Sequence, residues 1–267
     1  MIASPAGEAT GDRSSGSDSP QLSFRSRMAL AVQSLLVRLA GPITLTGIGF
    51  AMRFLYGFRF HGLRGIRRRF KDELKAYPGP VLIVANHLTF VDSPILTWGL
   101  APTWWYALHS AKMPWNTPER SNFAASPMTR VVVYLFKCLP ITRGGDRKVV
   151  TLVLDKLAHL LKRGHLVLMF PEGRRSRTTR IDRTHAAHGV GRLVKAVPGT
   201  RVLCVYLRGD HQDEYSLMPV KGETFHLATS WLEPATEKKG LRGSVDITGQ
   251  ILTRLEEMEA AYFDDRQ

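Results

Sequence analysis

The sequence predicts an α/β protein with a mostly parallel sheet covered by helices, preceded by an N-terminal membrane-associated helical pair. Short, continuous apolar runs of the kind found in strands buried on both faces alternate with apolar stripes at helical spacing. A long stretch with almost no charge precedes them. At 267 residues and 44% hydrophobic content, the chain is large enough for one such domain with appendages.

The first segment, residues 1–27, is rich in Gly, Ser, Asp and Pro and has few large apolar side chains. Such a composition cannot bury enough surface to offset the entropy lost on ordering. We therefore predict a disordered tail. No apolar core follows a basic start within it, so the pattern is not that of a signal peptide.

Residues 28–60 contain two uncharged runs, MALAVQSLLV and LAGPITLTGIGFAM, separated by Arg38. Each run is shorter than the roughly 20 residues that cross a bilayer core, and Gly41-Pro42 should break the helix between them. We expect two short helices in one leaflet, with buried core helices or a single span as alternatives. Cations that favour an anionic surface follow at once: Arg53, Arg59, Arg64, Arg67, Arg68, Arg69 and Lys71.

Residues 61–267 carry the strand and helix signals of one α/β domain with a C-terminal helix. The runs VLIVAN (81–86), HLVLMF (165–170) and RVLCVYL (201–207) predict three buried strands. Asp92-Ser93-Pro94 predicts a helix cap followed by proline at the first helical position. Two apolar stripes predict helices: one at Val150, Val153, Leu154, Leu157 and Leu161, and one at Ile247, Ile251, Leu255, Met258 and Tyr262.

His87 and Asp92 are the first candidates for chemistry, because His87 follows a predicted strand and ligand sites collect at the carboxyl ends of parallel strands. A neutral imidazole can take a proton from a hydroxyl near pH 7, and a carboxylate on its other nitrogen fixes the tautomer. The alternative makes Asp92 only a helix cap and His87 a loop residue.

A second strand end, FPEGRRSRT (170–178), places Glu172 beside a dense basic loop. Gly173 would let the backbone approach a ligand, and the arginines suit phosphate because guanidinium binds oxyanions in a bidentate fork. A solvated charge run is the alternative. Arg143, within LPITRGG, adds one more cation after a short apolar segment. His185 and His188 lack a carboxylate or cysteine at a matching interval, so we predict no metal site.

The motifs NHLTFVD, PITR and FPEG, followed by a hydrophobic strand, resemble the PlsC-like glycerolipid acyltransferases, the family of 1-acylglycerol-3-phosphate acyltransferases. The resemblance implies that His87 is the general base and Asp92 its orienting partner. It also assigns substrate-binding roles, with Arg143 on the acceptor phosphate and the others at the acceptor pocket or its flanking motif: Glu172, Gly173, Arg175 and Ser176. Arg174 stands where the family has threonine.

The function implied is transfer of a fatty acyl group from acyl-CoA or acyl carrier protein to a lysophospholipid-like acceptor, in membrane lipid biosynthesis. We expect no cofactor. The net charge of +14 indicates an anionic partner. Two isolated cysteines indicate a reducing compartment, hence a peripheral or monotopic protein on the cytoplasmic face of the cell membrane. We expect membrane lipids, not nucleic acid, as partners. The rival readings are a catalytically silent lipid-presenting module and a nucleic-acid binder.

Overall fold

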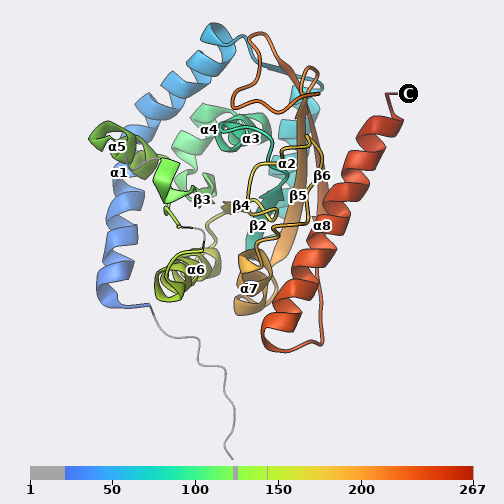
Figure 1. The fold of residues 1–267 in the computed structure, drawn as a ribbon. Helices are drawn as coiled ribbons and strands as arrows, with labels where there is room; N and C mark the ends of the chain where they lie inside the picture. Colours follow the sequence, from blue (N-terminus) through green and yellow to red (C-terminus); the bar gives the residue numbers. More distant parts are fainter. Residues whose placement is uncertain (1–21, 123–125, 143, 267) are drawn as a thin grey trace, which may run out of the picture.

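The computed structural model describes residues 22–122, 126–142 and 144–266. Residues 1–21 of the predicted tail therefore lie outside the described part, while the first helix begins at Phe24, four residues before the predicted start of the apolar segment. In Figure 1 this helix, α1, runs down one flank of the molecule and the C-terminal helix α8 runs down the other.

Helices and strands alternate along the domain as the apolar pattern predicts. The helical elements are α1 Phe24–Phe50, a π-helical turn at Ala51–Leu55, α2 Leu63–Ala76, α3 Asp92–Leu100, α4 Thr103–Leu108, 3-10 turns at Ser110–Lys112 and Arg120–Asn122, α5 Pro127–Leu135, α6 Arg147–Lys162, α7 Gly189–Ala196 and α8 Gly240–Asp264. The strands are β1 Arg59–Phe60, β2 Val81–Ala85, β3 Trp115–Asn116, β4 Val167–Met169, β5 Arg201–Gly209 and β6 Thr224–Leu232.

Across the described residues the strands form one six-stranded sheet in the order β1-β6-β5-β2-β4-β3. The predicted strands become β2, β4 and β5, which lie side by side and parallel. Strand β6 runs antiparallel to β5, whereas the other pairings within the described chain are parallel. The prediction of a mostly parallel sheet covered by helices is confirmed.

Alternate residues of the strands face two separate helical layers, as the two-residue period of a strand requires. On one face Ile83 and Leu203 belong to a core that includes residues of α1, α2, α3 and α4. On the other face Leu82 and Val202 join residues of α6, α7 and α8. The sheet is thus buried on both sides, which explains why its central strands read as unbroken apolar runs.

The N-terminal segment is one helix, so the prediction of two short helices broken at Gly41-Pro42 is wrong. Pro42 lies inside α1. Proline removes one helical hydrogen bond, but this cost is tolerated where neighbouring packing and Ser/Thr side chains support the freed backbone. Thr44 Oγ1 donates to the carbonyl of Ala40, 3.1 Å away, within the affected turn. Val37 and Leu45, on either side of the proline, are both buried in the core.

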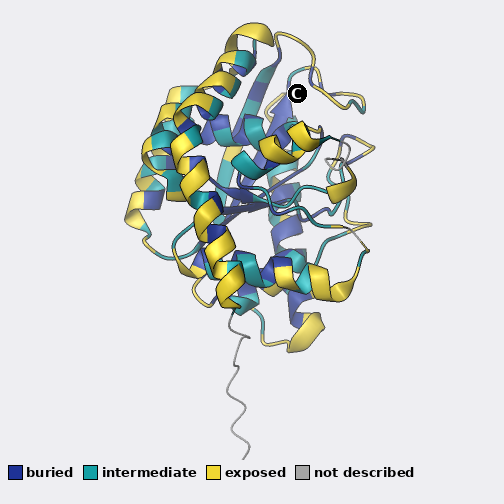
Figure 2. Ribbon diagram, turned by 90° about the vertical axis from the view of Figure 1, so that its left-hand side faces the viewer, coloured by how far each residue is buried: buried dark blue, intermediate teal, exposed yellow. Residues whose placement is uncertain are grey.

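Helix α1 buries only one narrow stripe, although most of its residues are apolar. The stripe is Leu30, Gln33, Val37, Gly41, Leu45 and Gly49. Gln33 Nε2 fixes the helix by donating to the carbonyl of Tyr134, 2.9 Å away at the end of α5. Most of the other side chains of α1 are exposed, among them Phe24, Leu39, Ile43 and Phe50. Figure 2 shows this helix from its outer side, largely in the colour of exposed residues. By length and hydropathy the stretch Phe24–Leu55 could cross a membrane, and 28% of its most apolar window is buried.

Gly49 and Gly47 give a matched test of how closely α1 must approach α4. A Cβ at Gly49 would lie 2.9 Å from Thr103 Cγ2, whereas a Cβ at Gly47 would meet nothing within 4 Å. Gly49→Leu should therefore destabilise the protein by about 1–3 kcal/mol through overpacking. Gly47→Leu should be neutral or stabilising, because leucine favours a helix more than glycine does. Denaturant unfolding in detergent measures both; equal stabilities would contradict this packing.

Candidate active site

The site lies where β2 and β4 end, because these strands are neighbours and parallel. His87 follows β2 and Glu172 follows β4, so both residues emerge at the same edge of the sheet. His87 Nδ1 lies 2.9 Å from Asp92 Oδ2, and the two side chains are only 12% and 3% exposed. A carboxylate oxygen accepts here, so in the neutral ring it is Nδ1 that carries the proton and Nε2 that has the free lone pair.

Asp92 fixes the loop that carries the histidine as well as the ring. Its Oδ2 also accepts from the backbone N–H groups of Leu88, at 2.6 Å, and Thr89, at 2.8 Å. Thr89 Oγ1 donates to the other oxygen. The expectation that Asp92 caps the following helix is wrong: Val91 occupies the cap position, and Asp92 is the first residue of α3. Its carboxylate is directed back at the loop, where it orients His87.

Glu172 supports His87 from the second strand end and is completely buried. Its Oε1 accepts from the backbone N–H of His87, 2.8 Å away, and its Oε2 from that of Asp182, 3.0 Å away. Burial raises the pKa of Glu172 to about 8, against the opposing effect of the two N–H donors. The side chain thus joins the His87 loop to the loop that follows β4.

Gly173 and Ser176 shape the same connection. Gly173 has a φ of 73° and a Cβ there would lie 2.4 Å from the carbonyl oxygen of His185, so only glycine fits. Ser176 is buried, its N–H donates to the carbonyl of His87 at 2.8 Å, and its hydroxyl donates to that of Arg180. The structure brings His87, Asp92, Glu172 and Ser176 together. Arg143 lies outside the described residues.

The arginines of the basic loop divide into two groups. Arg174 Nη2 donates to Asp182 Oδ2 at 2.9 Å, and Arg183 is paired with Glu256. Arg175 and Arg177 instead lie over the ring of Tyr215, 5.9 and 5.0 Å from its centroid. Within the described chain neither has a carboxylate partner, and Nη1 of Arg175 is buried without a hydrogen bond. Of the described arginines that line the cavity, these two are the ones without a carboxylate partner.

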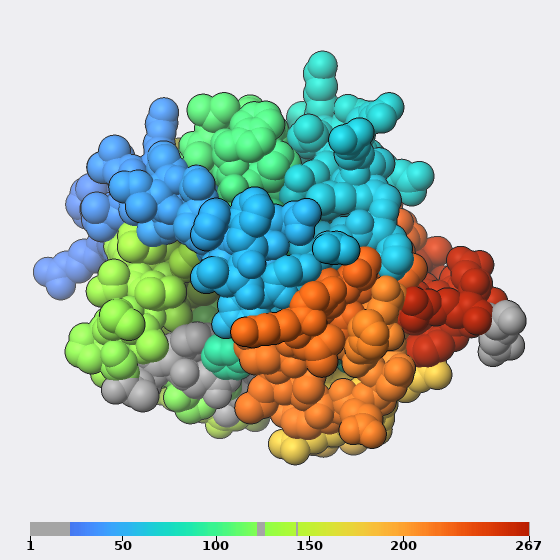
Figure 3. Space-filling model, turned by 90° about the horizontal axis from the view of Figure 1, so that it is seen from above, coloured from blue at the N-terminus to red at the C-terminus, as the bar shows by residue number. Residues whose placement is uncertain are grey.

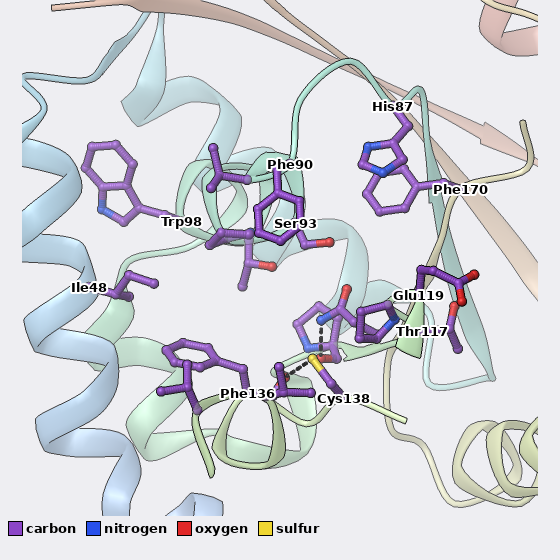
Figure 4. Close-up of a pocket in the computed structure, with 18 of the residues that line it drawn as sticks. Ile48, His87, Phe90, Ser93, Trp98, Thr117, Glu119, Phe136, Cys138 and Phe170 are labelled. Carbon is purple, nitrogen blue, oxygen red and sulfur yellow. Dashed lines mark hydrogen bonds between the residues drawn. The ribbon is translucent and has the colours of Figure 1, made fainter. Parts of the chain in front are cut away.

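A cavity of about 530 Å³ connects His87 to the N-terminal helix. Figure 4 shows His87 and Phe170 near one end, with Ile48 and Trp98 across the cavity from them. Arg174, Arg175 and Arg177 line it together with His87. The far walls come from α1, α3 and α5 and are mainly apolar, with Leu45, Ile48, Val91, Trp98, Val132, Val133 and Phe136 among their residues. The arrangement joins a proton acceptor and free cations to a space shaped for hydrocarbon.

Several residues beside His87 are given no role by the sequence analysis. Phe170 stacks on the His87 ring, with centroids 4.1 Å apart and an angle of 16°, and so limits its rotation. Phe90 N–H donates to the carbonyl of Leu217, 2.9 Å away, which places the connection between β5 and β6 beside the loop that carries His87. That connection also carries Tyr215. Phe170, directly before Pro171-Glu172, is the one that a closer reading of FPEG could have singled out.

The same connection is tied to the end of the N-terminal segment. Gly222 N–H donates to the carbonyl of Tyr56, 2.7 Å away. Seen from above in Figure 3, the two segments lie against each other, the first blue and the second orange. The N-terminal segment is therefore connected to the site both through the cavity wall and through this loop.

The family comparison covers the region that contains these features. The family model described as Acyltransferase matches residues 58–236. A search of curated proteins returned no significant match. The match includes His87, Asp92, Glu172 and the basic loop, and it spans well over half of the chain. The chain therefore belongs to the PlsC-type acyltransferase family.

Proposed function

We propose that the protein transfers a fatty acyl group from a thioester, acyl-CoA or acyl carrier protein, to a hydroxyl of a lysophospholipid-like acceptor. The observation that carries this proposal is the opening of the His87–Asp92 pair onto a mainly apolar cavity lined also by Arg175 and Arg177. Membership of the family supports acyl transfer in general. The apolar cavity supports a substrate with a lipid chain, and the arginines support one with a phosphate group.

The proposed reaction is direct attack. His87 Nε2 takes the proton of the acceptor hydroxyl while the oxygen attacks the thioester carbonyl carbon. Asp92 Oδ2 stabilises the imidazolium that forms. As the tetrahedral intermediate collapses, the new C–O bond is kept and the C–S bond breaks. The thiolate receives the proton from His87, so the base is regenerated with each turnover.

A covalent acyl-enzyme on cysteine is disfavoured by the surroundings of Cys138. This residue lines the cavity, but burial raises the pKa of its thiol to about 12. The thiolate is the nucleophilic form of cysteine, so a thiol with such a pKa is a poor acyl acceptor near pH 7. The direct route needs no residue beyond the His87–Asp92 pair.

The test of this function is turnover by the purified full-length protein with labelled acyl-CoA and acyl carrier protein thioesters and a panel of lyso-lipids. We expect transfer to a lyso-lipid that carries a phosphate and a free hydroxyl. Binding of lipid without transfer from any donor to any acceptor would replace the proposal with the silent lipid-presenting module.

Arg175→Ala tests the phosphate site. It removes a charge-assisted hydrogen bond worth about 1.5–3 kcal/mol, so the apparent KM for a phosphate-bearing acceptor should rise about ten-fold or more. Arg183→Ala is the matched control, because its guanidinium is already paired with Glu256. Steady-state kinetics separate the two substrates: a rise confined to the KM of the donor would place the donor phosphate at Arg175. By the family resemblance, Arg143 is proposed as a second phosphate contact.

We propose that the exposed apolar face of α1 holds the protein on the cytoplasmic face of the membrane, while the basic helix α2 adds attraction to anionic lipid. Apolar burial contributes about 25 cal/mol per Å² and is not weakened by salt. The Debye length falls to about 3 Å at 1 M salt, so the electrostatic part should vanish. The protein should stay with membranes in 1 M salt and leave only with detergent. Release by salt alone, measured by sedimentation, would contradict the anchor.

A further inference from the structure

Two histidines and an aspartate meet at an edge of the sheet, away from the cavity that holds His87. His61 Nε2 lies 3.0 Å from Asp210 Oδ2, and His226 Nε2 lies 3.2 Å from Asp210 Oδ1. The imidazole rings stack with their centroids 4.1 Å apart. One nitrogen or oxygen from each of the three side chains lies within 4.8 Å of the others.

The register of three strands fixes this meeting. Phe60 of β1 pairs with Phe225 of β6, which places the next residues, His61 and His226, side by side. Gly209 of β5 pairs with the same Phe225, and the N–H of Asp210 donates to the carbonyl of Thr224 at 2.9 Å. The cluster is therefore held by the backbone of the sheet and not by a flexible loop.

We propose that His61, Asp210 and His226 bind a divalent transition metal of the Zn²⁺ class. Imidazole nitrogen and carboxylate oxygen are the ligands that zinc prefers, and three protein ligands with an open position are a common set. Zn–N and Zn–O bonds of about 2.0–2.2 Å put tetrahedral ligand atoms roughly 3.3–3.6 Å apart. The two distances between a histidine nitrogen and an Asp210 oxygen, 3.0 and 3.2 Å, are therefore close to those that the metal requires. Mg²⁺ and Ca²⁺ prefer oxygen ligands, so this set disfavours them.

A side-chain cation already occupies the same position. Arg266 Nη2 donates to Asp210 Oδ1 and lies 3.3 Å from His226 Nε2, so it contacts two of the three proposed ligand atoms. The cluster therefore attracts positive charge, and a metal would have to displace the guanidinium. The three side chains are partly open to solvent, with exposures of 50% for His61, 23% for Asp210 and 33% for His226, so an ion can reach them.

The proposed site is structural, because none of its residues lines the cavity. An ion there would join the end of β1 to β5 and β6. It would also fix the start of the connection that carries Tyr215, which begins at Asp210. The site would also correct the expectation from the sequence that the chain binds no metal: the two histidines lie far apart along the chain, and only the sheet brings them together.

The test uses tag-free, full-length protein in detergent, stripped with chelator and titrated with Zn²⁺ against a chromophoric competitor. We expect one Zn²⁺ per chain and a rise in Tm on binding. His61→Asn and His226→Asn should each weaken Zn²⁺ affinity by at least about ten-fold and reduce the rise in Tm. Arg266→Ala should tighten binding. Mg²⁺ should leave Tm unchanged.

His185→Asn is the matched control, because it removes an exposed histidine outside the cluster and should leave Zn²⁺ affinity unchanged. Circular dichroism confirms that each variant is folded. Zn²⁺ affinity that is the same in His61→Asn, His226→Asn and the unmodified protein would overturn the proposal and leave the cluster as a hydrogen-bonded network around Arg266. These readouts do not depend on acyl transfer, so they are independent of the function proposed above.

Discussion

His87→Ala should lower turnover by about 10²–10⁴, the usual contribution of a general base, with the fold intact. The variant removes the proposed general base, whose Nδ1 is held by Asp92. Asp92→Asn should lose less, since an amide oxygen can still accept from Nδ1–H but carries no charge to stabilise the imidazolium. Initial rates with a saturating thioester and lyso-lipid measure both losses.

His109→Ala is the control for this series. His109 is exposed, its Nδ1 donates to the carbonyl of Trp105 one turn earlier, and it does not line the cavity. Its turnover should match that of the unmodified protein. Near-normal transfer by folded His87→Ala would exclude the general-base mechanism, whatever the effect of Asp92→Asn.

Glu172→Ala should lower the free energy of unfolding by about 2–5 kcal/mol, because it leaves the buried N–H groups of His87 and Asp182 without an acceptor. Turnover should fall with it, since the His87 loop loses its support from β4. Glu172→Gln keeps an oxygen for one of these donors and should lose less. Urea unfolding in detergent, together with initial rates, measures both effects.

The pH dependence of stability gives an independent readout of the same residue. The folded protein holds the Glu172 proton more tightly than the unfolded chain, since burial raises its pKa from 4.5 to about 8. Its contribution to stability is therefore full below pH 4.5 and is lost as the pH rises through about 8. The glutamine in Glu172→Gln cannot titrate, so the free energy of unfolding of this variant should fall less steeply between pH 4.5 and about 8. The difference in slope from the unmodified protein should be at most about 1.4 kcal/mol per pH unit. Exposed Glu237→Gln is the control; identical slopes for Glu172→Gln and the unmodified protein would contradict the burial effect.

The central strands and the contact between His87 and Asp92 could be predicted because their signals are local. Strands β2, β4 and β5 are buried on both faces, so each reads as a continuous apolar run. His87 and Asp92 lie five positions apart on one loop and helix start, close enough for a motif to record their contact. Strand β6 gives a weaker signal: it is only partly buried and includes His226, Thr229 and Ser230 among its apolar residues.

The misjudged features depend on contacts far apart in the chain. The rule that proline breaks a helix considers only the local sequence. At Pro42 the helix continues, because Val37 before the proline and Leu45 after it are both packed in the core. Tyr215 has no pattern around it, and its place at the arginines follows from the path of the β5–β6 connection. A segment that looks like a removable anchor is also a wall of the cavity, through Leu45, Ile48 and Met52. We therefore expect a chain without residues 28–60 to lose transfer even to a water-soluble acceptor.

Helix α1 has lipid proposed on its outer face and lines the cavity with its inner face. This double role affects how the enzyme can select for the length of a hydrocarbon chain. A hydrocarbon tail moving from water into the cavity would gain about 0.8 kcal/mol for each methylene. A hydrocarbon tail that enters the cavity directly from the bilayer moves from one apolar environment to another. It gains almost none of this transfer free energy, because lipid tails are as apolar as the cavity wall. For an acyl chain that arrives from the bilayer, preference for one length would then arise from the shape enclosed between α1 and α3, with little help from hydrophobicity. Departure of the finished lipid into the same leaflet would likewise meet little resistance.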